Sequence, residues 1–318
     1  MNENKTLYIV VPCYKEEAVL PETSRRLREK LKALQAQGKI SDRSRVMFVN
    51  DGSSDDTWPI ISRLHEEDPD VFSGVNLSRN RGHQNALLAG LLTAVNYADM
   101  IISMDADLQD DVNAVDEMVD RYHEGYEVVY GVRSKRDTDT FFKRFTAEGF
   151  YKVMKELGVD IVFNHADYRL MSRRAVEGLA QFGEVNLFLR GIVPQIGYKW
   201  TTVTYARAER FAGESKYPLK KMLAFAADGI TSFSVKPIRM VFSLGVVVFL
   251  VSLVMLLYAL VAKLTGHTSA GWTSLMGSIW LIGGIQLLSL GVVGEYVGKI
   301  YKETKHRPRF IIESVLNK

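Results

Sequence analysis

The 318-residue chain contains one cysteine, Cys13. A single thiol excludes an internal disulfide framework and fits a reducing, cytosolic compartment. The chain also lacks an excess of either charge, because 40 basic and 37 acidic residues leave a net charge of +3. We therefore expect no nucleic acid among its partners. No apolar core follows a basic start at the N-terminus, so we expect no signal peptide.

Residues 1–104 contain an alternation of short apolar runs with helical patterns. Strand-like runs are present at 7–11, 45–49, 72–77 and 100–104, and helical patterns lie between them. Strands that alternate with helices predict an α/β fold, in which a mostly parallel, doubly wound sheet is covered on both faces.

A polar cluster follows the second, third and fourth of these runs. The clusters are Asn50-Asp51-Gly52-Ser53, Ser78-Arg79-Asn80-Arg81-Gly82-His83 and Asp105-Ala106-Asp107-Leu108-Gln109. Because ligands of open α/β sheets lie beyond the carboxyl ends of the strands, we expect these clusters to share one edge. The carboxylates of Asp105 and Asp107 suit Mg²⁺, which binds through one or two carboxylates and substrate phosphates. The pair alone would indicate a solvated turn, but three clusters at one edge favour a ligand site.

The composition changes near residue 240. Residues 241–262 and 271–294 carry no charge, and each run is long enough to cross a bilayer as a helix. A buried helical hairpin is the alternative. Basic residues precede the first run and follow the second, whereas the loop between them has only Lys263. This distribution predicts a multi-pass protein with the α/β domain and both termini in the cytosol.

Four segments form a set: Pro12-x-Tyr14-x-Glu16, Asn50-Asp51-Gly52-Ser53-x-Asp55, Asn80-x-Gly82 and Asp105-Ala106-Asp107-Leu108-Gln109. They resemble the motifs of family 2 glycosyltransferases with the GT-A fold (Rossmann-like). Within that family the chain is similar to the bacterial polyprenyl-phosphate glycosyltransferases, which are related to dolichyl-phosphate mannose synthase. The segment 210–217 and the two C-terminal spans belong to the same pattern.

The resemblance implies four regions along the chain. A cytosolic GT-A catalytic domain would cover 1–218, and two transmembrane helices (about 241–262 and 271–294) would lie within 240–298. Residues 219–239 form either an amphipathic helix in the membrane interface or an ordinary packing helix of the catalytic domain. A basic cytosolic tail would cover 299–318. We expect a chain cut after about Lys236 to keep most of its nucleotide binding.

For the donor, the resemblance implies a nucleotide diphosphate sugar. Asp107, with Asp105 and Gln109, would hold Mg²⁺ or Mn²⁺, and the cation would stabilise the departing diphosphate. Instead of binding the cation, Asp105 could reach the ribose. The alternative to nucleotide binding by Tyr14 and Glu16 is packing at the strand end and a favourable charge at the helix N-terminus. The residues expected to bind the nucleotide sugar are Pro12, Tyr14, Glu16, Asp51, Ser53, Asn80, Gly82, Asp105, Ala106 and Arg210.

For the acceptor, a membrane-anchored transferase with a cytosolic site suits a polyprenyl phosphate, whose phosphate lies at the interface. Arginine suits phosphate through its bidentate fork, although an isolated arginine is commonly a surface charge. The residues expected near the acceptor phosphate are Arg133, Arg144, Thr146, Ser215 and Lys216. The synthases usually have a serine shortly after the second arginine, and Thr146 is our assignment in its place.

Asp167 corresponds to the carboxylate that is usually proposed as the catalytic base of inverting members, and with Asp107 it forms the expected catalytic pair. A phosphate monoester has a second pKa near 6, so much of the acceptor is already a dianion at neutral pH. Asp167 would then orient the acceptor, or take a proton only from the monoanion. A helix cap or a salt bridge to Arg169 or Arg173 is the alternative.

The sequence thus predicts a metal-dependent, inverting glycosyltransferase of the bacterial cytoplasmic (inner) membrane that moves one sugar to undecaprenyl phosphate. UDP-glucose is the first choice of donor, from similarity to the glucosyl-transferring branch; UDP-N-acetylglucosamine and GDP-mannose are alternatives. Small residues in the second span permit close helix packing and a homo-oligomer. They are Gly283, Gly284, Gly291, Gly294 and Gly298.

Two other functions are disfavoured. Processive polysaccharide synthases of the same fold share a Gln-x-x-Arg-Trp motif. This chain has Gln195-Ile196-Gly197-Tyr198-Lys199-Trp200, in which the spacing differs and lysine replaces arginine, and it has only two expected spans. A catalytically inactive membrane protein that binds a nucleotide or lipid would not need the intact acidic pairs.

Overall fold

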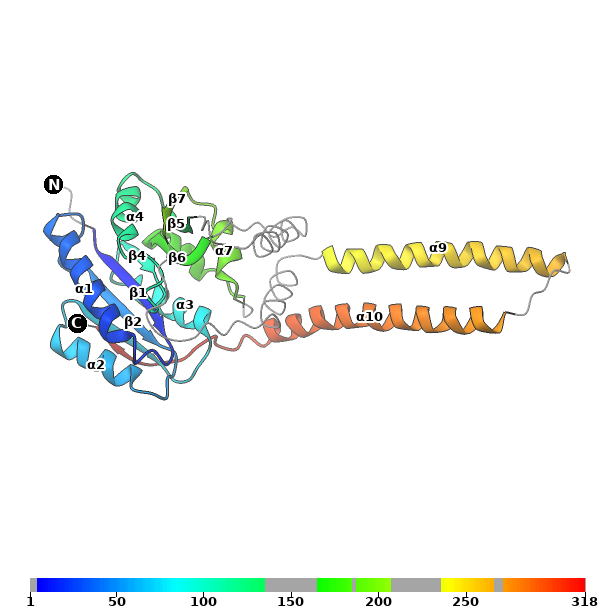
Figure 1. The fold of residues 1–318 in the computed structure, drawn as a ribbon, viewed down its shortest axis with the longest axis horizontal. Helices are drawn as coiled ribbons and strands as arrows, with labels where there is room; N and C mark the ends of the chain where they lie inside the picture. The colour runs from blue at the N-terminus through cyan, green and yellow to red at the C-terminus, as the bar shows by residue number, and fades with distance from the viewer. Residues whose placement is uncertain (1–4, 135–164, 185–186, 207–235, 266–270, 318) are drawn as a thin grey trace. The chain divides into compact units, whose positions relative to one another are not determined.

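The computed structural model describes residues 5–134, 165–184, 187–206, 236–265 and 271–317 (Figure 1). The chain divides into two compact units. The first comprises Met1–Tyr151, Asp160–Pro218 and Arg307–Lys318, and the second comprises Lys152–Val159 and Leu219–His306.

An eight-stranded sheet lies at the centre of the described part of the first unit, in the order β7-β5-β6-β4-β1-β2-β3-β8. β1 pairs in parallel with β2 and β4, β2 with β3, and β5 with β7, whereas β6 and β8 run antiparallel to their neighbours. The predicted α/β fold with a mostly parallel sheet is therefore confirmed. The strands are β1 (Leu7–Cys13), β2 (Arg45–Asn50), β3 (Phe72–Leu77), β4 (Met100–Ser103), β5 (Val128–Arg133), β6 (His165–Ser172), β7 (Trp200–Tyr205) and β8 (Ile312–Leu316).

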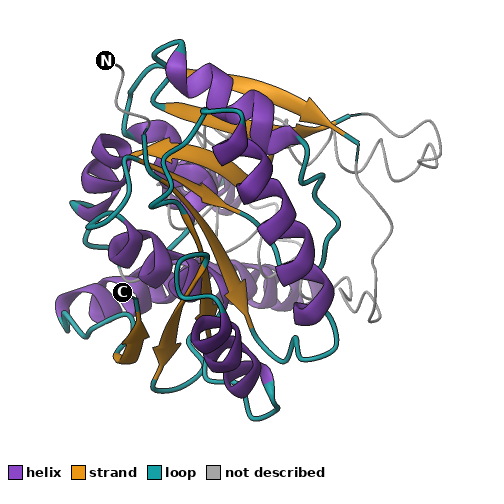
Figure 2. Cartoon of the chain, turned by 90° about the vertical axis from the view of Figure 1, so that its left-hand side faces the viewer, coloured by secondary structure: helices purple, strands orange, loops and turns teal. Residues whose placement is uncertain are grey.

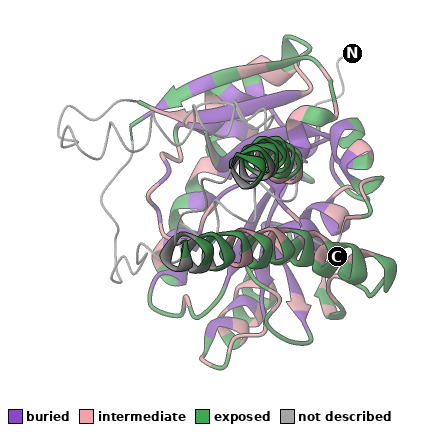
Figure 3. Cartoon of the chain, turned by 90° about the vertical axis from the view of Figure 1, so that its right-hand side faces the viewer, coloured by how far each residue is buried: buried purple, intermediate pink, exposed green. Residues whose placement is uncertain are grey.

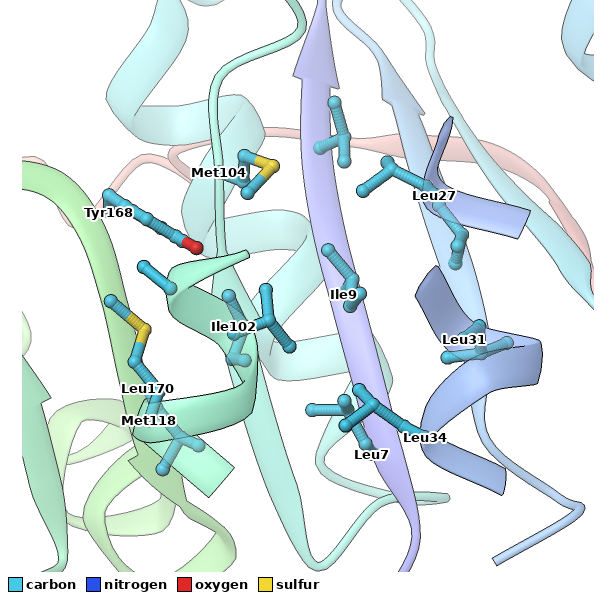
Figure 4. Close-up of a cluster of buried hydrophobic side chains, with 14 of the residues drawn as sticks. Leu7, Ile9, Leu27, Leu31, Leu34, Ile102, Met104, Met118, Tyr168 and Leu170 are labelled. Atoms are coloured by element: carbon cyan, nitrogen blue, oxygen red, sulfur yellow. The ribbon is translucent and has the colours of Figure 1, made fainter. Parts of the chain in front are cut away.

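Helices cover the sheet (Figure 2). Those of the first unit are α1 (Leu20–Ala36), α2 (Thr57–Glu67), α3 (His83–Ala94), α4 (Ala114–His123), α6 (Arg173–Ala180) and α7 (Leu189–Gln195). Leu27, Leu31 and Leu34 share one face of α1 and belong to the same buried cluster as Leu7 and Ile9 of β1 (Figure 4). Replacing one of these buried leucines by alanine would cost about 2–5 kcal/mol of stability.

α3 packs on β1 and β2 from the side of the sheet opposite to α1. Neighbouring side chains of a strand point to opposite faces, so Ile9 faces α1 and Val10 faces α3. Gly90 of α3 lies directly against the side chains of Val10 and Val49, where a Cβ atom would clash. Every residue of β1 and β2 is buried, as expected for strands that are covered on both faces.

The C-terminal segment returns to the sheet as β8. This strand pairs antiparallel with β3, so that Val75 lies opposite Val315 and Asn76 opposite Ser314. The Nδ2 atom of Asn76 donates a 2.8 Å hydrogen bond to Oε2 of Glu313. The sequence predicts a basic tail over 299–318 and no strand there. In the structure β8 covers the edge of β3, which would otherwise present unpaired backbone groups.

The second unit contains α9 (Lys236–Leu264) and α10 (Trp272–Thr304). Both are long and apolar enough to cross a membrane, over Lys236–Met255 at mean hydropathy 2.4 and Leu281–Thr304 at 1.4. The side chains described in the two helices are mostly exposed (Figure 3), in contrast to those of β1 and β2. The two expected helices are present, and α10 extends beyond the expected end at 294. Residues 219–235 of the expected interface region lie outside the described residues.

Candidate functional site

β1, β2, β3 and β4 run in the same direction, so the loops that follow them leave the sheet at one edge. We call this the carboxyl edge, and it comprises residues 14–16, 51–53, 78–83 and 105–110. The N–H of Asp51 donates a 2.9 Å hydrogen bond to the carbonyl oxygen of Cys13, which joins the second loop to the end of β1. The polar clusters singled out in the sequence therefore lie together.

Asp51 organises the loop that follows β3. Its Oδ1 accepts a hydrogen bond from the N–H of Arg81 at 2.7 Å, and its Oδ2 accepts one from Gly82 at 2.9 Å. Gly82 has φ +87°, a conformation that favours glycine, and Asn80 is exposed on the same loop. Burial raises the pKa of Asp51, whereas the two N–H groups favour the ionised form. Asp51 thus shapes the loop, and its contact with a nucleotide base stays a prediction.

Gly52 allows the loop after β2 to pack closely against the loop after β3. A Cβ atom at this position would lie 2.5 Å from the backbone carbon of Arg79 and from the nitrogen of Asn80. Gly52 also has φ +61°, so a larger residue would be strained as well as obstructed. The Asn50-Asp51-Gly52-Ser53 segment is therefore built for close packing against the loop after β3.

The loop after β1 is tied to the loop after β2. The Ser53 hydroxyl accepts a 3.1 Å hydrogen bond from the N–H of Lys15, and the Thr57 hydroxyl accepts one of 3.0 Å from the N–H of Glu16. Directly before these two anchored residues, Tyr14 is 45% exposed, whereas Pro12 is buried in β1. An exposed aromatic ring at a polar edge is accessible to a ligand, and the binding of the nucleotide sugar by Tyr14 stays a prediction.

Asp105, Ala106, Asp107 and Gln109 follow β4 at the same edge. Oδ1 of Asp107 accepts a 3.2 Å hydrogen bond from the N–H of Gln109, which makes a tight turn around Leu108 at φ +58°. The pKa of Asp105 is raised to about 6. Removal of water by the surrounding protein is the main cause, although 36% of the side chain stays accessible, and nearby carboxylates add to it while His83 opposes it.

Asp167, on β6, lies in a cluster of basic groups. Nη2 of Arg169 donates to its Oδ1 at 2.7 Å, and Arg190 of α7 donates from Nε to Oδ1 at 3.2 Å and from Nη2 to Oδ2 at 3.1 Å. Burial would raise the pKa of Asp167, but Arg190 and Arg169 outweigh burial and hold it well below the ordinary value. The alternative of a salt bridge to Arg169 is therefore what the structure contains. The strongly ionised carboxylate is poorly suited to take up a proton.

His83 connects Asp167 to the carboxylates after β4. Its Nε2 lies 3.5 Å from Oδ1 of Asp105 and 3.8 Å from Oδ2 of Asp167. His83 is the first residue of α3, so the start of this helix contributes a side chain to the carboxyl edge.

Arg133 ends β5 and also faces this edge. Its Nε donates to the Tyr205 hydroxyl at 3.3 Å, and its Nη2 lies 3.6 Å from Oδ1 of Asp110, which also accepts from the Tyr205 hydroxyl. Burial, followed by the charge of Asp110, raises the pKa of Tyr205, so its hydroxyl stays protonated as a donor. The structure thus brings Arg133 to the acidic loop after β4 and pairs it with Asp110.

The carboxylates of Asp105 and Asp107 suit a divalent cation if a substrate phosphate supplies further oxygen ligands. Among the described residues no group of three or more His, Cys, Asp or Glu side chains could hold a metal ion. Mg²⁺, however, usually binds through one or two carboxylates, with substrate phosphates and water as further ligands. Asp105 and Asp107 provide two neighbouring carboxylates whose mutual repulsion contributes to the raised pKa of Asp105. A cation bound together with a diphosphate would relieve that repulsion.

Several predicted residues fall outside the described part of the chain. They are Arg144, Thr146, Arg210, Ser215 and Lys216. Conversely, the structure adds His83, Asp110, Arg169 and Arg190, for which the sequence predicts no role in binding or catalysis. The position of His83 at a predicted helix start and of Asp110 beside Gln109 could have suggested two of them. Arg190 gives no such signal, because only the tertiary structure brings α7 to Asp167.

Comparison with known families gives two matches. The model described as "Glycosyl transferase family 2" matches residues 8–179, and the model described as "GtrB C-terminal hairpin" matches residues 236–300. The first covers the strands β1 to β6 from residue 8 onward, together with the carboxyl edge, and the second covers α9 and most of α10.

Individual proteins are also similar to this chain. An uncharacterised glycosyltransferase of Bacillus subtilis (strain 168), YkoT, is 53% identical over 96% of this chain and 91% of its own length. The bactoprenol glucosyl transferase of Shigella phage SfV is 39% identical over 96% of this chain and 97% of its own length. Among solved structures, glucosyl-3-phosphoglycerate synthase from Mycobacterium tuberculosis aligns at a TM-score of 0.44 and 18% identity, over 71% of this chain and 78% of that chain.

Proposed function

The chain belongs to glycosyltransferase family 2, and we propose that it transfers one glucose from UDP-glucose to a polyprenyl phosphate. The match of residues 236–300 to the GtrB hairpin supports the lipid acceptor, as do relatives named bactoprenol glucosyl transferases. The observation that carries the proposed chemistry is the carboxyl edge, where Asp51 follows β2 and Asp105 and Asp107 follow β4.

On the donor side, the nucleotide would lie along the loops after β1, β2 and β3. Asp107, with Asp105 and Gln109, would hold Mg²⁺ or Mn²⁺, and a bound cation would act as a Lewis acid on the departing diphosphate. The remaining donor residues of the proposal are Pro12, Tyr14, Glu16, Asp51, Ser53, Asn80, Gly82, Ala106 and Arg210. Exposure of Tyr14 and Asn80 supports their place in it, because both can meet a ligand without rearrangement of the core.

On the acceptor side, a phosphate oxygen attacks C1 of the glucose while the bond from C1 to the diphosphate oxygen breaks and UDP leaves. A single displacement of this kind inverts the configuration at C1. The attacking dianion needs no base, because the second pKa of a phosphate monoester is about 6. Arg133, Arg144, Thr146, Ser215 and Lys216 are the proposed acceptor residues, and the low pKa of Asp167 supports attack without proton transfer to it.

We further propose that α9 and α10 anchor the enzyme in the bacterial cytoplasmic membrane as two spans. The catalytic domain and both termini would face the cytosol, where nucleotide sugars are made, and glycines in α10 would allow helices of a homo-oligomer to pack closely. The length and hydropathy of both helices support this arrangement. The basic residues that flank the spans support the orientation.

A donor panel tests the proposal directly. The full-length chain, purified in detergent, is given Mg²⁺, undecaprenyl phosphate and UDP-glucose, UDP-N-acetylglucosamine or GDP-mannose, and the lipid product is identified by mass spectrometry. We expect a hexose on the lipid phosphate with UDP-glucose and a β linkage by NMR. A product only with one of the other two donors would overturn the choice of sugar. Repeated addition of sugars would instead indicate a processive synthase, and no product with any donor would overturn the acceptor.

A further inference from the structure

Two cations face the single carboxylate of Asp167. Arg190 forms a bidentate pair with it, through Nε at 3.2 Å and Nη2 at 3.1 Å, and Arg169 donates from Nη2 at 2.7 Å. The three charged groups together carry one net positive charge. Two guanidinium groups around one carboxylate can offset further negative charge nearby, such as that of Asp105 or of a bound anion.

The two arginines differ in what can reach them. The Arg169 side chain is only 1% exposed, and its Nη1 donates to the carbonyl oxygen of Leu189 at 3.4 Å, so it fixes the start of α7. The Arg190 side chain is 32% exposed. Gln84 of α3 also accepts a 3.0 Å hydrogen bond from the N–H of Leu189, which anchors α7 from a second side. Arg190 is thus an accessible cation on a segment that is held in place.

Arg190 is linked to Asp105 through Asp167 and His83. The Nε2 atom of His83 lies 3.5 Å from Oδ1 of Asp105 and 3.8 Å from Oδ2 of Asp167. One imidazole ring therefore separates Asp167, the partner of Arg190, from Asp105, which is proposed to bind the cation. In a direct displacement the attacking oxygen approaches C1 from the side opposite the departing diphosphate. A phosphate that enters this region meets the negative charges of Asp105 and Asp167, and it needs a cation to offset them.

We propose that Arg190 binds the phosphate of the acceptor, and that Asp167 is a positioning residue for Arg190 rather than a catalytic base. The inference rests on the proposed function, because it assigns the acceptor within the same site. A guanidinium has five N–H donors in a planar fork, so one arginine can hold a carboxylate and a phosphate together. The two carboxylate oxygens of Asp167 accept hydrogen bonds from both arginines. The depressed pKa of Asp167 agrees with a carboxylate that stays ionised.

The test separates binding of the acceptor from the chemical step. Steady-state kinetics are measured with both substrates varied, for the full-length wild type, Arg190→Gln, Asp167→Asn and the double variant. Because hydrogen bonds to charged groups are strong, Arg190→Gln should raise the KM for polyprenyl phosphate about 10-fold or more, with the KM for the nucleotide sugar nearly unchanged. Asp167→Asn should also raise the acceptor KM, and the double variant should be no worse than Arg190→Gln.

A catalytic base would give the opposite pattern. Asp167→Asn would then lower kcat at saturating acceptor by about 10²–10⁴-fold, and Arg190→Gln would add to that loss. Arg190→Lys is the second variant, because it keeps the charge and loses the fork, and it should fall between wild type and Arg190→Gln. Arg174→Gln is the matched control, since Arg174 is an exposed arginine of α6 beyond the other end of β6. Its kinetics should equal those of the wild type.

A binding measurement keeps this inference separate from the proposed function. Polyprenyl phosphate and the uncharged polyprenol are titrated into the wild type and Arg190→Gln in detergent, with thermal unfolding as the check on folding. The variant should bind the phosphate lipid about 10-fold more weakly and polyprenol like the wild type. If the wild type transfers no sugar, the proposed function fails, but this comparison still tests Arg190. If the wild type transfers sugar and Arg190→Gln keeps its acceptor KM and affinity, the role of Arg190 is overturned and the proposed function stands.

Discussion

The hydroxyl of Thr23 donates a 2.8 Å hydrogen bond to the carbonyl oxygen of Ala106, which lies between the two carboxylates after β4. Thr23 is buried in the first turns of α1, and its hydroxyl also lies 3.1 Å from the carbonyl oxygen of Val19. The helix after β1 therefore fixes the backbone that carries Asp105 and Asp107. Thr23 influences the site without facing a substrate.

Thr23→Val should loosen the loop after β4 while it preserves the shape of the side chain. The carbonyl oxygen of Ala106 would lose a buried donor, at a cost of about 1–3 kcal/mol in unfolding free energy. Thermal unfolding and activity at limiting Mg²⁺ measure the two effects, and Thr23→Ser, which keeps the hydroxyl, is the control. A Thr23→Val protein with the stability and the Mg²⁺ requirement of the wild type would show that this bond does not organise the loop.

The pH dependence of transfer should not report the ionisation of Asp167. Its pKa is depressed, so Asp167 stays ionised at all pH values where the enzyme is assayed, and its contribution to stability is lost only as the pH falls through that low value. We expect the rate at saturating acceptor to fall on the acid side near pH 6, where the acceptor phosphate takes up its second proton. The same acid limb should persist in Asp167→Asn. Its disappearance in that variant would restore Asp167 as the base.

Removal of the C-terminal strand should weaken the donor site. A chain that ends at His306 loses β8, and with it the 3.0 Å hydrogen bond from the N–H of Ser78 to the carbonyl oxygen of Ile311. Ser78 begins the loop that Asp51 organises, so we expect a lower Tm and weaker UDP binding by calorimetry. Glu313→Gln, which changes one side chain of β8 and keeps the strand, is the milder control. Wild-type UDP affinity in the truncated chain would contradict this role of β8.

The same strand changes an expectation from the sequence. The sequence alone predicts that a chain cut after about Lys236 keeps most of its nucleotide binding, but such a chain lacks β8 as well as α9 and α10. We now expect it to lose nucleotide affinity unless 307–318 is supplied again, for example through a short linker in place of 237–306. Comparison of the two shortened chains would separate the effect of the spans from the effect of the edge strand.

The parts of the fold that the sequence predicts well are those with a strong local signal. Leu7, Ile9 and Val11 lie in a continuous apolar run, and polar side chains begin where β1 ends, so the strand and the edge could both be predicted. The same holds for β4 and the carboxylates that follow it. The long uncharged runs of α9 and α10 are equally clear, because apolar runs of this length are typical of helices that cross a membrane.

The parts that the sequence does not predict depend on pairing between distant segments. β8 has only five residues, one of them charged, and shows no regular alternation of apolar and polar side chains, so its register follows from its pairing with β3. Arg190 could be placed near Asp167 only once β6 and α7 were known to meet. The resemblance of the segment around Asp167 predicts a functional carboxylate. Its low pKa, however, depends on Arg169 of β6 and Arg190 of α7, two elements that are distant in sequence.

The central claim is that the carboxylates after β4 support transfer of a sugar to polyprenyl phosphate, and Asp107→Asn tests it most directly. The substitution removes one charge from a partly exposed side chain without touching the core, so the protein should unfold at the wild-type temperature. Formation of radiolabelled lipid from UDP-glucose in Mg²⁺ is measured for both proteins. We predict a loss of about 10²-fold or more in the variant, as expected when stabilisation of a leaving group is removed. Turnover of the folded variant close to that of the wild type would contradict the account.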